Sequence, residues 1–157
     1  MKSWPEFASL RPDLAETGRD LLFQVGVGLG FLATTRADGA PRVHPMCPLL
    51  HPTGLFAFII PSPKQRDLVR DGRYALHSFP CADNEDAFSC TGKARLVTDH
   101  ELRSELSDVF VTERLQLAVP APSEQDALIE FRVGSCLLTR TTGHGDAHPV
   151  HHVWRDE

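Results

Sequence analysis

The sequence lacks the features that mark several large classes of protein. No apolar run approaches the roughly 20 residues that a membrane-spanning helix needs, and the opening stretch MKSWPEFASLRPDL has neither the apolar core nor the cleavage site of a secretory signal. Lysine and arginine total 16 against 21 aspartates and glutamates, which gives a net charge of −5. Nucleic acids and anionic membranes bind basic surfaces instead. We therefore expect a cytoplasmic protein with no nucleic-acid or membrane partner.

Cysteine is scarce and its spacing carries no metal or redox motif. The four cysteines stand far apart, at Cys47, Cys81, Cys90 and Cys136, with no Cys-x-x-Cys pair. This spacing argues against a zinc ribbon and against a dithiol redox site. We expect all four to be reduced and to behave as small core residues.

The chain has the length and composition of one globular domain. It contains 157 residues, 41% of them hydrophobic, and shows no repeat, linker or low-complexity tract. A chain of this size buries a sizeable core. We therefore treat residues 1–157 as a single domain.

Short apolar segments separated by turn residues predict an antiparallel sheet. Asp-Gly and Pro-Thr-Gly stand between the first three segments, and the last two segments form a closing pair of strands around Gly134. Few helical segments lie between them, which argues against a parallel sheet and favours a closed or partly closed antiparallel barrel. The segments are FLATTR, PRVHPMCPLL, LFAFII, YALHSF, DAFSCTGKARLVT, DALIEFRV and SCLLTRTT.

Helix-start signals occur at three places. Pro12 opens an amphipathic segment, and Thr98 with Glu101 forms a capping box before a third helix. In PSPKQRDL, Ser62 suits the N-cap, Pro63 suits the first helical position, and Gln65 is placed to complete a capping box.

Lys64 in the first turn of this second helix is an unusual choice. A cation there opposes the positive end of the helix dipole at a cost of up to about 1 kcal/mol. A bound anion such as a phosphate group removes that repulsion. The competing interpretation is a lysine that points into solvent, where salt screens the charge.

The stretch from Gly28 to Asp99 resembles the flavin-binding split-barrel family of pyridoxamine 5'-phosphate oxidase. The matching features follow in order: a strand, an Asp-Gly turn, the strand PRVHP, the strand LFAFII, the Ser-x-Lys helix start and then VRDGRYALH. The resemblance implies a mainly β (α+β) fold, a six- to seven-stranded antiparallel split β-barrel with peripheral helices. It also implies a homodimer that holds FMN in grooves at the subunit interface.

The resemblance assigns cofactor contacts to ten residues. It implies that the strand arginine and the residues after it lie along the cofactor, that the Ser-x-Lys helix start holds its phosphate, and that a tryptophan near the chain end folds over the groove. The ten residues are Arg42, Val43, His44, Pro45, Phe58, Ile59, Ser62, Pro63, Lys64 and Trp154.

Two positions depart from the family pattern. Pro63 stands where relatives carry an arginine, which removes a charge-assisted contact worth about 1.5 to 3 kcal/mol. Phe58 stands where relatives often carry a threonine hydroxyl. The chain also ends in HHVWRDE with no match for the groups that grip a vitamin B6 phosphate. The resemblance therefore implies a flavin-dependent oxidoreductase that acts on another small molecule.

The alternatives concern the ligand. The same fold accommodates a deazaflavin coenzyme, whose acidic tail needs cations, and Lys64, Arg66, Arg70 and Arg73 are the candidates. A non-catalytic flavin- or haem-binding protein is the other alternative, with His44, His77 or the tail histidines as axial ligands. His44 and His77 also qualify as proton donors. We predict no metal site, because His144 and His148 are separated by a Gly-Asp turn and not by a helical turn.

Overall fold

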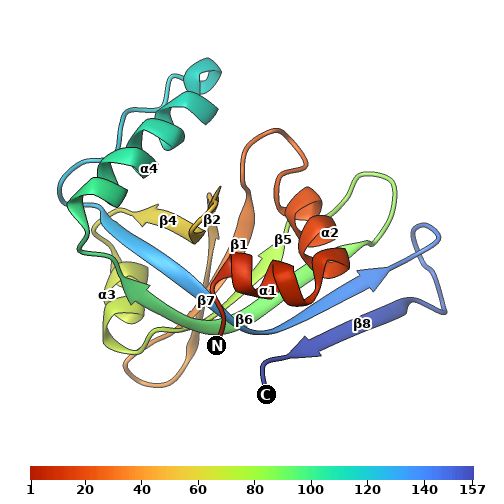
Figure 1. Ribbon diagram of the computed structural model, residues 1–157. Coiled ribbons are helices and arrows are strands. Elements are labelled where there is room, and N and C mark those ends of the chain that lie inside the picture. The colour runs from red at the N-terminus through yellow and green to blue at the C-terminus, as the bar shows by residue number, and fades with distance from the viewer.

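A computed structural model describes all residues from Met1 to Glu157 and contains one antiparallel sheet. The sheet order is β2-β1-β5-β6-β7-β4-β3, and β8 pairs with the second half of β7. The sheet curls into a half-barrel with helices around it (Figure 1), which confirms the predicted split barrel. Its strands are β1 (Gly30–Thr35), β2 (Pro41–Met46), β3 (Leu49–His51), β4 (Gly54–Ile59), β5 (Arg73–Ser78), β6 (Ala87–Leu96), β7 (Ala127–Arg140) and β8 (Val150–Arg155).

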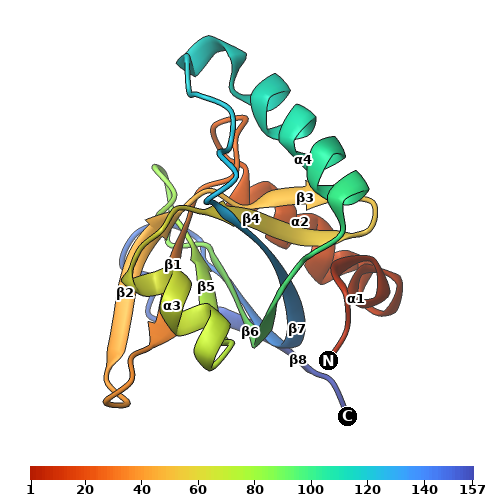
Figure 2. The same ribbon diagram turned by 90° about the vertical axis from the view of Figure 1, so that its left-hand side faces the viewer.

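Four α-helices and one 3₁₀ turn surround the sheet. They are α1 (Trp4–Leu10), α2 (Pro12–Leu22), α3 (Pro63–Arg70), α4 (His100–Glu113) and η1 (Leu115–Leu117). The pair α1 and α2 covers one face of β6 and β7, whereas α3 lies beside β1 and β2 at the other end of the sheet (Figure 2). The helix α4 projects from the edge of the half-barrel beside β3 and β4 (Figures 1 and 2).

Two hydrophobic clusters hold these elements together. The main core has 22 buried residues and joins α1, α2 and α3 to the sheet. A smaller cluster of four buried residues, Leu49, Phe56, Leu106 and Leu128, attaches α4 to β3, β4 and β7. Because Leu106 is the only buried residue of α4, that helix depends on far less burial than α1 and α2 do.

The closing strand pair around Gly134 was predicted wrongly, because β7 is one continuous strand of 14 residues. The irregularity lies in its neighbour, where the β6–β7 register shifts between Thr91 and Gly92. A Cβ at Gly92 would lie 1.9 Å from the carbonyl oxygen of Arg132. Glycine at position 92 therefore allows β6 to bulge toward β7, and β7 remains continuous.

Three features of the helices complete the fold, and the first of them corrects a prediction. The side chain of Asp99, not Thr98, caps α4 by accepting from the backbone N–H groups of Glu101 and Leu102. The segment around Trp4 is a capped helix, whose N-cap Ser3 forms a capping box with Glu6. None of the helices combines the length and the apolar character that a membrane crossing requires.

The thiols are all unpaired, but they do not share one environment. Cys90 and Cys136 are buried as predicted, and burial raises the pKa of Cys90 to about 12 and that of Cys136 to about 11. Cys81 is half-buried. Cys47 is exposed and the core prediction for it is wrong, because it lies between β2 and β3, where Pro48 interrupts the predicted single strand.

Candidate anion site at the start of helix α3

The predicted start of α3 is confirmed. Ser62 is the N-cap, and its Oγ accepts from the backbone N–H of Gln65 at 3.3 Å and donates to the carbonyl of Ile60 at 2.8 Å. Pro63 occupies the first helical position. The capping-box prediction is wrong in one detail, because the Gln65 amide donates to the carbonyl of Ile59 at 2.8 Å and not back to Ser62.

Lys64 carries a charge that no carboxylate balances. Its Nζ donates to the carbonyl oxygen of Pro45 at 3.4 Å, which is its one hydrogen bond. Partial burial lowers the pKa of Lys64, and the nearby Cys47 acts in the opposite direction. Pro63 has no N–H, and those of Gln65 and Arg66 are bonded to Ser62, so the backbone N–H of Lys64 is the free one in the first turn. A half-buried ammonium beside a free N–H at a helix start is a suitable place for an anion.

A neighbouring face of α3 holds two arginines around one buried carboxylate. Asp67 is 4% exposed, and its carboxylate accepts from Arg42 Nε at 2.8 Å, Thr34 Oγ1 at 3.1 Å and Arg70 Nη1 at 3.3 Å. Burial alone raises the pKa of Asp67, but the hydrogen bonds from Arg42 and Thr34 and the charges of both arginines outweigh it and lower the pKa. Arg70 also donates to the carbonyl of Thr35. The network fastens α3 to β1 and β2.

An arginine-lined hollow of about 480 Å³ opens on this side of α3. Two carboxylates share it with four guanidiniums, and Arg36 pairs with Asp38 at 2.9 Å. Arg73, which was grouped with these cations by sequence, binds Asp71 at 2.6 Å outside the hollow. The four arginines are Arg36, Arg42, Arg66 and Arg70.

The pleat of β2 divides its predicted contacts between two faces. Val43 is 61% exposed, and Pro45 is exposed on the same side. Arg42 and His44 point to the other side, and His44 Nε2 is buried without a hydrogen-bond partner. The face of Val43 and Pro45 is free to contact a ligand, with the Lys64 ammonium on the carbonyl of Pro45.

Two of the predicted contacts have side chains committed elsewhere. Ile59 is 1% exposed and belongs to the main core. Phe58 lies 5.8 Å from the ring of Phe110 in an edge-on arrangement, and the guanidinium of Arg103 stacks 5.2 Å from the Phe58 ring. Only the backbone of these two residues remains for a ligand at the start of α3.

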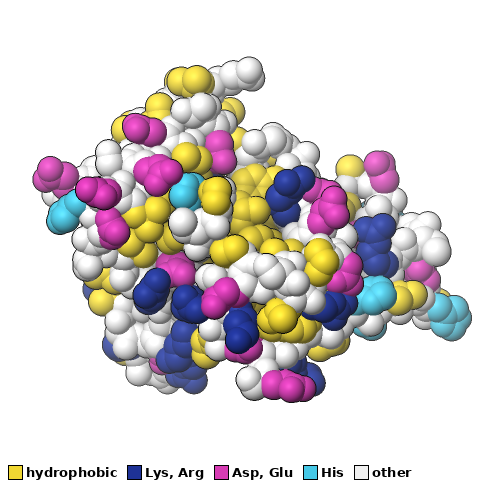
Figure 3. All heavy atoms as spheres, viewed as in Figure 1, with side chains coloured by type: hydrophobic (Ala, Val, Ile, Leu, Met, Phe, Trp, Pro, Cys, Tyr) yellow, Lys and Arg dark blue, Asp and Glu magenta, His cyan; other side chains and the backbone are white.

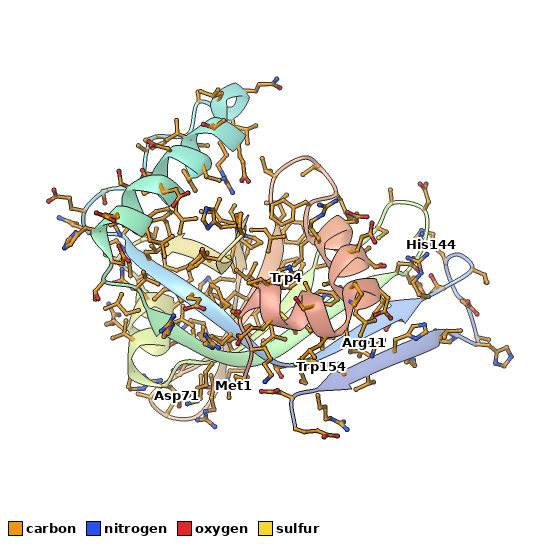
Figure 4. The ribbon with its side chains drawn as sticks, viewed as in Figure 1. Met1, Trp4, Arg11, Asp71, His144 and Trp154 are labelled. Carbon is orange, nitrogen blue, oxygen red and sulfur yellow. The ribbon has the colours of Figure 1, made fainter.

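Trp154 lies in β8, far from α3 in the same subunit. Its ring packs 4.9 Å from that of Phe7 in α1, and its strand pairs with Cys136. Figure 4 shows Trp154 well separated from Asp71, which follows the C-terminal end of α3. The role assigned to Trp154 by resemblance therefore requires a second subunit.

The C-terminal histidines are dispersed. His144 Nε2 donates to the carbonyl of Ala82, 3.1 Å away, and His151 Nδ1 pairs with Thr139 Oγ1 at 3.0 Å. No group of three histidine, cysteine, aspartate or glutamate side chains is placed to hold a metal ion.

Sequence reasoning missed Asp67. Its signal was its place in PSPKQRDL, one helical turn after Pro63 and three residues after Lys64. A buried carboxylate near a predicted strand arginine indicates an ion pair, and that would have connected Asp67 to Arg42.

Comparison with known proteins identifies the fold through solved structures, but not a family. No protein-family model matches the sequence, and no curated protein matches it. Similar solved structures include a haem-binding protein from Mycobacterium smegmatis, with 14% identity and a TM-score of 0.67 over 88% of this chain. The chain spans 57% of that protein.

Two further structures match over nearly their whole length. General stress protein 26 from Bacillus anthracis str. Sterne has 16% identity and a TM-score of 0.62, covering 90% of this chain and 97% of its own. A putative pyridoxamine 5'-phosphate oxidase from Listeria innocua has 15% identity and a TM-score of 0.61, covering 78% of this chain and 95% of its own. The chain therefore has the split-barrel fold of pyridoxamine 5'-phosphate oxidase-like proteins.

Proposed function

We propose that this protein binds FMN with the phosphate at the start of α3 and works as a flavin-dependent oxidoreductase. The unpaired, half-buried ammonium of Lys64 carries this proposal. The backbone N–H of Lys64, which has no acceptor in the chain, supplies a donor for a phosphate oxygen, and the charge-assisted contact from the Lys64 ammonium supplies most of the specificity.

The residues fit FMN with fewer contacts than the family pattern provides. Pro63 offers no guanidinium, and the aromatic side chain of Phe58 is packed on α4 and offers no hydroxyl. Arg42 is already paired with Asp67. We therefore expect an FMN affinity that depends strongly on Lys64.

Bound FMN would supply hydride or electron transfer, and the chain would bind and orient it. The exposed face of Val43 and Pro45 gives the ring a flat apolar surface. Pro41 and Pro45 have no N–H, so the backbone N–H of Val43 is the candidate donor from the outer edge of β2 to a ring acceptor. The substrate is a small molecule other than a vitamin B6 phosphate.

The visible absorption spectrum tests the proposal directly. Purified protein is mixed with FMN, desalted and scanned, and then assayed for NAD(P)H oxidation. Retained and shifted flavin bands support FMN binding, and NAD(P)H oxidation that needs bound flavin supports an enzyme. A protein that retains no flavin contradicts the proposal.

The proposal includes a homodimer in the cytoplasm with the cofactor at the subunit interface, as the resemblance implies. Trp154 would then reach the groove of the second subunit. We expect Trp154→Ala to lose about 2 kcal/mol of stability from the contact with Phe7. If Trp154 also contacts flavin, the variant shows weaker FMN binding and altered flavin fluorescence. Unchanged affinity and fluorescence in folded protein would leave Trp154 a packing residue only.

The deazaflavin coenzyme is the alternative within the same fold. Four arginines against two carboxylates line the hollow beside α3, and the unpaired Arg66 favours an acidic tail more than FMN alone requires. Parallel titrations with FMN and the deazaflavin decide between them, because a tail that uses these arginines makes the deazaflavin the tighter ligand.

Haem binding is a second candidate, favoured by one observation. His44 Nε2 is buried and has no hydrogen-bond partner, which leaves a nitrogen free for an axial bond. Haem addition should then give a Soret band that His44→Ala abolishes and His77→Ala retains. A spectrum of free haem, or one unaffected by His44→Ala, counts against this candidate.

A further inference from the structure

A cavity of about 710 Å³ lies between the loop that joins α2 to β1 and the C-terminal end of α4. Its lining is mainly apolar and includes Val25, Leu29, Phe110, Leu115, Leu117 and Val119. Figure 3 shows hydrophobic side chains gathered in the hollow between α4 and α2. A cavity of this size accommodates a small organic molecule.

One buried cation lines this cavity and is incompletely paired. Arg114 is 3% exposed, and its guanidinium stacks 4.2 Å from the ring of Phe110. Its Nη1 donates to the carboxylate of Glu113 at 3.0 Å and to the carbonyl of Phe110 at 3.3 Å. Its Nη2 is buried and has no acceptor. A buried N–H group without a partner is rare and calls for an acceptor from outside the chain.

The charges around the cavity determine what kind of acceptor fits. Cys47, Glu113 and Arg114 are the only ionisable groups in its lining, and Glu113 already balances the charge of Arg114. A carboxylate ligand would therefore add an unbalanced negative charge to an apolar space. A neutral carbonyl oxygen would accept from Nη2 without that cost.

We propose that this cavity binds an uncharged apolar carbonyl compound, such as an aryl ketone or a quinone. The carbonyl oxygen accepts from Arg114 Nη2, and the hydrocarbon body packs against Val25, Leu115 and Leu117. Those three side chains are 67%, 70% and 58% exposed without a ligand. Covering them is the hydrophobic contribution to binding.

The segment that follows Arg114 has a backbone conformation that favours movement. Nη2 is covered in the ligand-free chain, so a ligand reaches it only when a neighbouring part of the chain moves. Ala118, which ends η1, has a φ of 50° in the left-handed region that residues other than glycine rarely adopt. A change at this residue would let η1 move, and η1 contributes Leu115 and Leu117 to the lining of the cavity.

Competition against a fluorescent ketone tests the proposal, and it needs no flavin. The probe is 6-propionyl-2-dimethylaminonaphthalene, whose emission shifts to the blue in an apolar site. We expect 2-acetonaphthone to displace it at about a tenfold lower concentration than 2-ethylnaphthalene, which lacks the acceptor, or 2-naphthoate, which carries a charge. No probe binding, equal displacement by ketone and hydrocarbon, or tightest binding of the carboxylate overturns the proposal.

Two variants locate the site. Arg114→Met should abolish the preference for ketone over hydrocarbon, and Leu117→Glu should weaken probe binding at least about tenfold by placing a charge in the apolar wall. Arg19→Met, on α2 outside this cavity, is the matched control and should change nothing. If Arg114→Met does not fold, the probe binding of Leu117→Glu and the order of displacement by the three ligands still test the proposal. Unchanged probe binding in folded Leu117→Glu contradicts the proposed location.

Discussion

Two neighbouring faces of α3 hold their cations in different ways. On one side, the buried carboxylate of Asp67 pairs with Arg42 and Arg70 and fastens the helix to the sheet. On the other, Lys64 lies half-buried with only the carbonyl of Pro45 as a partner. Cations that already have a carboxylate stabilise the fold, whereas a cation without one is available to a ligand.

Removing the carboxylate tests the paired side and should have the largest effect. We expect Asp67→Asn to lose about 2 kcal/mol of unfolding free energy, because it leaves the partly buried Arg42 without its ion pair. Urea denaturation measures the loss. Asp38→Asn breaks the exposed pair with Arg36 and should cost under about 0.5 kcal/mol. Equal losses in both variants would mean that the burial of Asp67 contributes nothing.

Removing the unpaired cation should affect the ligand and not the fold. We expect Lys64→Gln to weaken FMN binding about tenfold, or about 1.4 kcal/mol. The ligand-free protein should be equally stable or slightly more stable, because the lysine opposes the helix dipole. Fluorescence titration with FMN and urea denaturation measure the two effects. Lys93→Gln, whose Nζ binds the carbonyl of Asp71, is the control. A loss of stability with unchanged affinity would make Lys64 a structural residue.

The pH dependence of FMN binding should show whether the charge of Lys64 binds the phosphate. Burial lowers the pKa of Lys64, so its charge is lost at a lower pH than in an exposed lysine, which titrates near 10.4. The charged form binds phosphate, and affinity should therefore fall as pH rises toward that pKa. The fall should be absent from Lys64→Gln and present in Lys93→Gln. Identical alkaline profiles in all three proteins would assign the effect to another group.

The smallest effect is expected at Arg66. It lies on the arginine-lined side of α3, exposed, with no ion pair. Arg66→Gln should change FMN affinity less than about twofold, since a solvent-screened cation contributes little to a phosphate it does not touch. A larger fall for the deazaflavin than for FMN would show that an acidic tail uses this side. A tenfold fall for FMN itself would remove the distinction between the two sides.

The sequence predicted the parts of the structure that depend on neighbouring residues. Ser62 and Pro63 specify the start of α3 within a few residues, and alternating apolar segments with Asp-Gly turns specify an antiparallel sheet. Features that depend on distant partners were missed. Asp67 becomes an anchor only when Thr34 and Arg42 fold against it. Likewise, β7 runs through Gly134 because the bulge is taken up by Gly92 in another strand.

The candidate site was predictable only where the ligand contact is local. Lys64 was singled out from its position in the first helical turn, and its lack of a carboxylate partner agrees with that interpretation. The side-chain directions of Phe58 and Ile59 depend on α4 and on the main core, respectively. Arg114 was overlooked because its burial arises where the end of α4 approaches the loop before β1.

The small cluster beneath α4 implies that this helix opens locally at a lower free energy than the rest of the fold. Only Leu106 of α4 is fully buried, against four residues in the whole cluster and 22 in the main core. Local opening that exposes so little apolar surface requires much less free energy than global unfolding. The amide hydrogens of α4 should therefore exchange with solvent well before those of β6 and β7. Detachment of α4 would open the space between this helix and α2 to solvent and ligands, while the half-barrel stays folded.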